Sequence, residues 1–139
     1  RHKETDKIFA VVNTHFSLSD SSFTDNTIPL TQALELITLC KDLKNLFNCP
    51  VFPLGDFNTH KPTKKTPSPI NDILVTAFKN TLTLAKTVSH GENTNNKTLF
   101  IDHIFSFGDA TVIRHATLSQ SKFKELSDHY PIFCDISIQ

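Results

Sequence analysis

Apolar residues in the first half of the chain follow two spacings, one typical of strands and one of helices. Residues 8–12 form a continuous apolar run rich in β-branched side chains, which predicts a strand buried on both faces. Residues 29–47 carry apolar side chains at helical spacing, and Pro29 suits the first helical turn. Residues 51–54 predict a second short strand, in which Pro53 removes a ladder donor and is unusual for a central strand.

The second half continues with a helix and then with strands. A Ser-Pro pair at residues 68–69 begins a segment of helical spacing. Residues 99–105 and 111–116 predict strands separated by a turn at Gly108. The last strand alternates, with one face formed by Ile132, Cys134, Ile136 and Ile138. No linker or repeat divides residues 1–139, so we predict one layered α/β domain, or part of one, with a mixed sheet and flanking helices.

Composition excludes some classes of protein and leaves others open. A hydrophobic content of 38% with 12 Phe favours a packed core over a disordered tail. Fourteen basic and fourteen acidic residues cancel, so no overall positive field draws the chain to nucleic acid, although the groove of a nuclease could still be positive. No apolar run approaches the ~20 residues that cross a membrane. The three cysteines lack zinc-type spacing, which favours buried free thiols and a reducing, intracellular compartment.

Four short motifs place Asp, Asn or His at or just beyond an apolar run: Asn13-Thr14-His15, Gly55-Asp56-Phe57-Asn58, Ile101-Asp102-His103-Ile104 and Ser127-Asp128-His129-Tyr130-Pro131. If the first two strands are parallel neighbours, His15 and Asp56 emerge at one edge of the sheet, where ligand sites of α/β proteins gather. Asp56 and Asn58 would point the same way in an extended turn. A carboxylate there can accept a proton from water, and a carboxamide can donate to a phosphate oxygen.

The third and fourth motifs add an aspartate and a histidine. Asp102 and His103 lie on opposite faces of a strand, so only one can reach a given site, and we interpret His103 as a core or second-sheet histidine. A loop can direct both Asp128 and His129 inward. A carboxylate for a divalent cation beside an imidazole for a phosphate oxygen fits phosphoester hydrolysis. Asp102 could hold the His129 imidazole in the required tautomer.

In this order the four motifs resemble the later motifs of the endonuclease/exonuclease/phosphatase superfamily, the DNase I-like metal-dependent phosphoesterases. The resemblance covers about residues 8–138. It implies a DNase I-like four-layer α/β sandwich, with two sheets packed face to face and helices outside, of which this chain is the second half. It also implies hydrolysis of phosphodiester or phosphomonoester bonds with Mg²⁺, or with Mn²⁺ in its place.

The resemblance implies a role for each polar side chain. Asp56 would align or deprotonate the attacking water, and Asn58 would hold the scissile phosphate. His15 and His129 would contact phosphate oxygens and stabilise the developing negative charge. Asp102 would orient His129.

The cation ligands implied by the resemblance are incomplete. Asp128 and Asp56 are the carboxylates expected near the cation, but the early Asn and Glu motifs of the family have no counterpart before His15. Mg²⁺ relies on few, well-placed carboxylates, so its affinity should fall sharply. The chain begins with Arg1 and contains no Met. We therefore expect that an N-terminal half is required, and that the isolated chain is weakly active or inactive and associates through an uncovered apolar sheet face.

The substrate stays open among nucleic acid, lipid head groups and inositol phosphates. Lys61, Lys64 and Lys65 could bind further phosphates, but a solvated loop is the simpler interpretation. One alternative function is a catalytically inactive remnant that acts only as a binding module. The missing ligands favour that alternative, and the intact motifs argue against it. A hydrolase of another mechanism is disfavoured because the sequence has no G-x-S-x-G elbow, P-loop or H-E-x-x-H.

Overall fold

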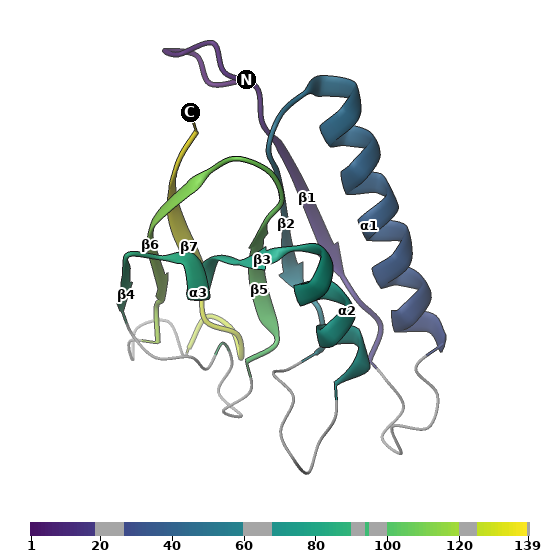
Figure 1. Cartoon of the computed structure of the whole chain (residues 1–139). Coiled ribbons are helices and arrows are strands. Elements are labelled where there is room, and N and C mark those ends of the chain that lie inside the picture. Colours follow the sequence, from purple (N-terminus) through teal and green to yellow (C-terminus); the bar gives the residue numbers. More distant parts are fainter. Residues whose placement is uncertain (19–26, 60–67, 90–93, 95–99, 120–124, 139) are drawn as a thin grey trace.

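The computed structural model describes residues 1–18, 27–59, 68–89, 94, 100–119 and 125–138, and these form a mixed α/β structure (Figure 1). The elements are β1 (Ala10–His15), α1 (Thr27–Phe47), β2 (Val51–Asp56), α2 (Pro69–Ala77), β3 (Lys79–Asn80), α3 (Thr81–Leu84), β4 (Thr87–Ser89), β5 (Asp102–Ser106), β6 (Thr111–Thr117) and β7 (Ile132–Ser137). The α/β class and the order of the longer elements confirm the prediction from the sequence.

The strands form two mixed sheets. The first has the order β1-β2-β5-β3, in which β1 and β2 are parallel and the other neighbours are antiparallel. The second has the order β4-β6-β7, with β4 parallel and β7 antiparallel to β6. Consecutive strands β5 and β6 belong to different sheets, and the segment between them arches from one sheet to the other (Figure 1).

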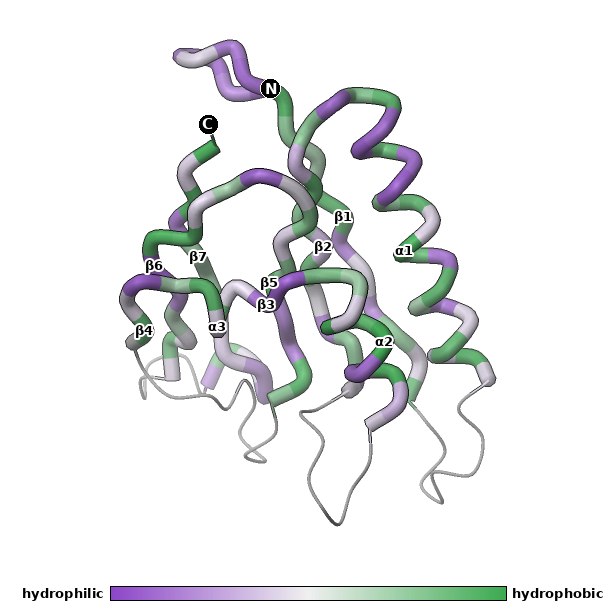
Figure 2. Tube along the Cα trace, in the orientation of Figure 1, coloured by the Kyte–Doolittle hydropathy of each residue, from purple (hydrophilic) through white to green (hydrophobic). Residues whose placement is uncertain are grey.

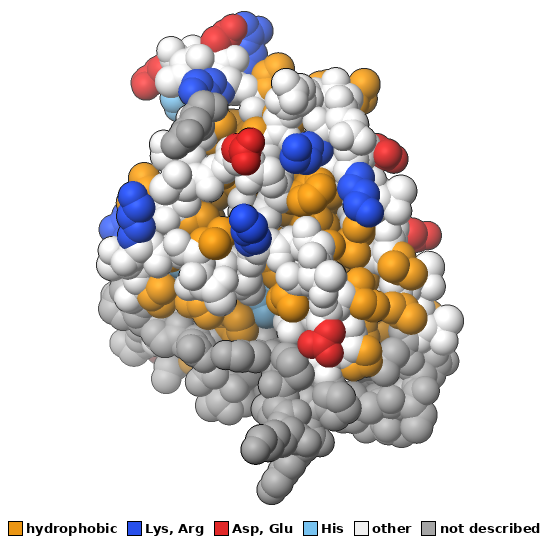
Figure 3. All heavy atoms as spheres, viewed as in Figure 1, with side chains coloured by type: hydrophobic (Ala, Val, Ile, Leu, Met, Phe, Trp, Pro, Cys, Tyr) orange, Lys and Arg blue, Asp and Glu red, His pale blue; other side chains and the backbone are white. Residues whose placement is uncertain are grey.

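Helices α1 and α2 pack against each other, and their side chains form a core with the first sheet. Hydrophobic and hydrophilic residues alternate along α1 (Figure 2), and its buried side includes Ala33, Leu36 and Cys40. The core cluster is completed by Phe16, Val51, Phe57, Ile70, Leu74, Phe78 and Phe105. Hydrophobic side chains also remain exposed over the helical side of the molecule (Figure 3), including Leu34, Leu39 and Val75.

Strand β1 differs from its prediction. It begins at Ala10, and its residues alternate between part-buried and exposed, with Val11 52% exposed. Ala10 and Val12 pack against the core below α1, whereas the described residues leave the opposite face of β1 uncovered. The expectation of a strand buried on both faces is therefore wrong, because a helix covers only one of them.

Pro53 lies buried in β2, which is a central strand of the first sheet. Val51 forms a bridge with Phe107, and the ladder between β2 and β5 resumes at the pair Leu54 and Ile104. Pro53 falls between these two points of pairing. The sheet therefore accommodates a residue without an N–H where its ladder is interrupted.

The helices begin close to where the sequence predicts. Helix α1 starts at Thr27, two residues before Pro29, and α2 starts at Pro69 after its N-cap Ser68. The Ser68 hydroxyl makes no capping bond and instead lies 2.6 Å from the Thr59 hydroxyl.

Among the described residues, no helix is long and apolar enough to cross a bilayer.

The cysteines are free thiols. Cys40 and Cys49 are buried, and Cys134 is part-buried. Burial raises the pKa of the Cys40 thiol to about 11, so this side chain stays protonated and packs as a small apolar group.

Candidate active site

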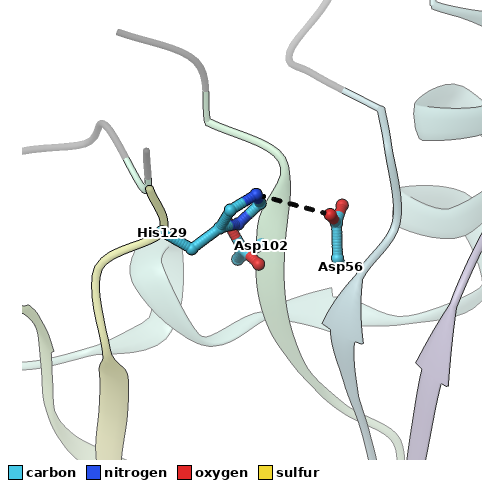
Figure 4. A group of neighbouring side chains, drawn as sticks. All are labelled: Asp56, Asp102 and His129. Atoms are coloured by element: carbon cyan, nitrogen blue, oxygen red, sulfur yellow. Dashed lines mark hydrogen bonds and ion pairs between the residues drawn. The ribbon is translucent and has the colours of Figure 1, made fainter. Parts of the chain in front are cut away.

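Strand pairing brings the first three motifs together. His15 lies opposite Asp56 in the parallel pair β1 and β2, and Asp56 lies opposite Asp102 in the antiparallel pair β2 and β5. The carboxyl ends of β1 and β2 and the amino end of β5 therefore meet at one end of the first sheet (Figure 1). His129 reaches this end from the loop that precedes β7 (Figure 4).

Gly55 allows β1 and β2 to approach at this end of the sheet. Its φ is +133°, and a Cβ added there would lie 1.9 Å from the carbonyl oxygen of Thr14. A side chain at this position would clash with the backbone of the neighbouring strand, and its φ would be strained. Glycine therefore sets the position of Asp56, the next residue.

Asp102, His129 and Asp56 form a compact group (Figure 4). His129 Nδ1 lies 2.9 Å from Asp102 Oδ2, and His129 Nε2 lies 3.9 Å from Asp56 Oδ2. Each residue offers one ligand atom, and these atoms lie within 4.8 Å of one another. Nδ1 donates to Asp102, and the other ring nitrogen, Nε2, faces Asp56.

The turn that begins at Asp56 orients the Asp56 carboxylate. Its Oδ1 accepts a hydrogen bond of 2.8 Å from the backbone N–H of Asn58. Its Oδ2 lies 3.5 Å from His15 Nε2, so this oxygen faces the imidazoles of both His15 and His129. The His15 side chain is 74% exposed and lies on the outer side of the group.

The predicted extended turn at Asp56 and Asn58 is wrong, because Asn58 adopts a left-handed conformation. Its φ is 47°, in the left-handed region that asparagine tolerates. The Asp56 side chain accepts from the Asn58 N–H two residues on, which is the bond that closes an Asx turn. The Asn58 Nδ2 donates to the carbonyl oxygen of Phe16 at 2.7 Å. A carboxamide nitrogen has two N–H groups, so one of them remains to donate elsewhere.

Aromatic rings lie beneath these polar side chains. Phe16 follows His15, and Phe57 lies between Asp56 and Asn58. The rings of Phe16 and Phe57 are buried, with centroids 5.0 Å apart, and Phe57 also contacts Phe105 at 5.2 Å.

The surroundings shift the pKa of both members of the Asp102 and His129 pair. Burial raises the pKa of Asp102, the hydrogen bonds from Thr94 and His129 partly offset this, and the charge of Asp56 adds to the rise. Burial alone would lower the pKa of His129. The hydrogen bond and charge of Asp102, with the charges of Asp56 and Asp128, outweigh burial and raise that pKa. The acidic neighbours therefore favour the protonated form of the His129 imidazole.

His103 lies in the core, as the alternation of the strand predicts, and only 1% of it is exposed. Its Nε2 lies 2.9 Å from the Thr59 carbonyl oxygen, and its Nδ1 lies 3.1 Å from Asn80 Nδ2. Since a carbonyl can only accept, Nε2 carries the proton and Nδ1 accepts from Asn80. Burial lowers the pKa of His103 to about 4.

Asp128 is exposed and lies outside the three-residue group. Lys61, Lys64 and Lys65 lie outside the described residues.

Ser127 and Thr94 also shape the site, although the sequence did not single them out for a role. The Ser127 hydroxyl accepts from the His129 N–H at 3.0 Å. Polar residues in a loop carry no periodic signal, so nothing in the sequence marks these contacts.

The residues of the group fit a divalent cation in part. Asp56 and Asp102 place two carboxylates opposite each other, and their mutual repulsion favours a bound cation. Mg²⁺ prefers six oxygen ligands in octahedral geometry, and its remaining positions are commonly taken by water and substrate. These two carboxylates therefore supply negative charge and some of the oxygen ligands that such an ion needs.

The chain is similar to solved structures of the endonuclease/exonuclease/phosphatase fold. An endonuclease/exonuclease/phosphatase from Bacteroides vulgatus has a TM-score of 0.79 at 23% sequence identity. The matched region covers 97% of this chain and 51% of the Bacteroides vulgatus chain. A mannosyl-6-phosphatase from Bacteroides thetaiotaomicron has a TM-score of 0.78 at 20% identity, covering 97% and 53%. The catalytic domain of human Nocturnin has a TM-score of 0.71 at 19% identity, covering 99% and 50%.

No protein-family model and no curated protein matches the sequence. The likeness therefore rests on the arrangement of the sheets and helices. The chain spans about half the length of the structures that it matches. It has the endonuclease/exonuclease/phosphatase fold, and its extent is consistent with the C-terminal half of that fold.

Proposed function

We propose that this chain is the C-terminal part of a Mg²⁺-dependent phosphoesterase that hydrolyses phosphodiester or phosphomonoester bonds. The observation that carries the proposal is the group at the end of the first sheet. An imidazole bonded at 2.9 Å to one aspartate faces a second aspartate at 3.9 Å. The similar structures support the proposal, since one of them is a phosphatase by name.

In this proposal Asp56 acts on the water nucleophile. Its Oδ1 is held by the Asn58 N–H, which leaves Oδ2 to align the water and to accept its proton. The Asn58 carboxamide keeps one N–H to donate to an oxygen of the scissile phosphate.

The Nε2 atoms of His15 and His129 act on phosphate oxygens. His129, protonated on both nitrogens, donates through Nε2 while Asp102 holds Nδ1. His15 donates from the outer side of Asp56. Both contacts strengthen as negative charge develops on the phosphate oxygens in the transition state, which lowers the barrier to hydrolysis.

Asp56 and Asp128 are the carboxylates that we propose as ligands of Mg²⁺, or of Mn²⁺ in its place. Asp102 is the carboxylate opposite Asp56 and contributes to the same negative field. When bound, the cation would polarise the phosphate and neutralise its charge. Because the chain spans about half of the structures that it matches, we propose that an N-terminal half supplies further acidic ligands.

The incomplete ligand set favours one alternative, a catalytically inactive module that binds phosphate esters. This alternative keeps the imidazole and carboxamide donors of the site and does without hydrolysis. The two functions differ in turnover, so one assay separates them.

The test is Mg²⁺-dependent hydrolysis of a generic phosphodiester, bis(p-nitrophenyl) phosphate, by the chain within its full-length protein. His129→Ala should lower the rate by about 10²–10⁴-fold, the range of a positioned acid–base group. His2→Ala, which changes an exposed histidine outside the site, is the matched control. Equal rates for wild type and His129→Ala would show that the activity arises elsewhere. Binding without turnover would favour the alternative.

The same assay separates the candidate substrate classes. DNA, RNA, a phosphoinositide head group and a sugar phosphate are compared at equal concentration in Mg²⁺. The class with the highest kcat/KM identifies the natural phosphate ester. A phosphomonoester is included because a mannosyl-6-phosphatase shares the fold.

A further inference from the structure

Thr94 is a buried residue between β4 and β5 that contacts the start of β5. None of its surface is exposed. Its Oγ1 accepts hydrogen bonds from the backbone N–H groups of Ile101 and Asp102, both at 3.0 Å. One hydroxyl therefore fixes the backbone at the residue that carries a site carboxylate.

Burial raises the pKa of Asp102, and a hydrogen bond with the Thr94 side chain lowers it. A hydroxyl has two acceptor positions, and Thr94 uses both on two consecutive residues. This arrangement fixes the backbone at Asp102, whose carboxylate bonds to His129.

The backbone of Thr94 reaches the other member of the pair. Its carbonyl oxygen accepts from the N–H of Tyr130 at 2.8 Å, and Tyr130 directly follows His129. Asp102 and His129 come from different elements, and their own hydrogen bond spans 27 residues of sequence. Thr94 is therefore bonded to both segments that must meet for that bond to form.

We propose that Thr94 is a positioning residue that holds Asp102 and His129 in register through its hydroxyl and its carbonyl. Its effect on catalysis rests on the proposed phosphoesterase function. Its effect on the hydrogen bond between Asp102 and His129 holds without turnover.

Thr117 offers a matched control for removal of a buried hydroxyl. It is as fully buried as Thr94, but its Oγ1 has no hydrogen-bond partner among the described residues. Replacing either residue by valine keeps the shape and removes the hydroxyl. Only at Thr94 does the change leave two backbone N–H groups without the hydroxyl that accepts from them.

The experiment compares Thr94→Val, Thr94→Ser and Thr117→Val in the full-length protein by NMR and by kinetics. We expect Thr94→Val to accelerate amide exchange at Ile101 and Asp102. We also expect it to remove the low-field proton resonance of the His129 Nδ1–H. Thr94→Ser should retain both signals, and Thr117→Val should leave both unchanged. If Thr94→Val does not fold, Thr94→Cys, whose thiol bonds weakly, replaces it with the same expectations.

In the phosphodiester assay, Thr94→Val should lower kcat by about 10–100-fold, as loss of an orienting partner does at comparable sites. KM should stay close to wild type, and Thr94→Ser should restore kcat. The proposal would be overturned if a folded variant without the hydroxyl kept the wild-type amide exchange rates at Ile101 and Asp102 together with the low-field resonance of His129. An unchanged kcat would overturn it as well. A wild-type protein without turnover counts against the phosphoesterase function, and the NMR signals then decide the role of Thr94.

Discussion

His129 Nδ1 lies 2.9 Å from Asp102 Oδ2, and this bond leaves Nε2 of the same ring facing Asp56. Asp102 lies at the start of β5, and His129 lies in the loop before β7. One carboxylate therefore fixes the tautomer of the imidazole while another faces its reactive nitrogen.

Asp102→Asn should lower the pKa of His129. The wild-type pKa is raised because Asp102 and neighbouring acidic charges outweigh burial. Asparagine removes the charge nearest the ring, so the effect of burial gains weight and the pKa falls. An NMR titration of the His129 ring protons measures the change, with Asp109→Asn as a control at an exposed acidic residue. An unchanged pKa would contradict the coupling. Under the proposed function, phosphodiester hydrolysis should also fall by about 10²–10⁴-fold in the same variant.

Gly55→Ala should destabilise the fold by more than ~1 kcal/mol, because alanine at positive φ is strained and its Cβ has no space. That Cβ would lie 1.9 Å from the Thr14 carbonyl oxygen in the neighbouring strand. Gly108→Ala is the matched control, since φ there is +111° but the nearest atoms lie 3.2 Å away. Urea unfolding should show the larger loss for Gly55→Ala. Equal losses would indicate that backbone strain alone determines both results.

His103 should make the stability of the chain depend on pH. Its pKa is about 4 in the folded protein, against an ordinary 6.5, so the unfolded chain binds more protons between these values. The stabilisation is fully present above pH 6.5 and is lost as the pH falls toward 4. At about 1.4 kcal/mol per pKa unit it amounts to about 3 kcal/mol.

His103→Gln tests this dependence. Glutamine can donate to the Thr59 carbonyl and accept from Asn80, as the neutral imidazole does, but it does not titrate. Urea unfolding between pH 4 and 7 should show a shallower loss of stability for this variant. His115, whose pKa burial also lowers, contributes in both proteins and cancels in the comparison. Parallel pH profiles would exclude His103 as the source.

Mg²⁺ should raise the melting temperature of the chain, because a ligand that binds only the folded state stabilises it. Asp56 and Asp102 lie opposite each other on neighbouring strands, and a cation relieves their repulsion. Asp56→Asn should reduce the Mg²⁺-dependent shift, whereas Asp42→Asn, on the exposed side of α1, should preserve it. Thermal unfolding with and without millimolar Mg²⁺ measures the shift. An equal shift in both variants would place the cation elsewhere.

Periodic segments of the fold could be predicted from the sequence, and the short ones could not. Helix α1 and strand β7 follow from spacing that persists over many residues. Strand β3 has two residues, and α3 has four. Strand β3 is defined by its pairing with β5. Helix α3 is capped by the Asn80 side chain, which accepts from the Leu82 N–H. Neither contact has a periodic signature in the sequence.

The site divides in the same way. Alternation along β5 correctly separates Asp102, which faces the site, from His103, which is buried in the core. The bond from Asn58 to the Phe16 carbonyl and the bonds of Thr94 depend on backbone atoms of segments brought together by folding. A backbone carbonyl or N–H is present at nearly every position, so the sequence does not mark which of them are used.

The aromatic rings of Phe16 and Phe57 connect the proposed active site to the hydrophobic core. Each is a direct chain neighbour of a polar residue of the site, and the two rings touch each other. A smaller apolar residue at either position would leave a void in the core. The nearby backbone could relax into that void and displace the adjacent polar side chain of the site by a fraction of an ångström. Such a variant would still unfold cooperatively, so under the proposed function a substitution in this part of the core would reduce activity before it prevented folding.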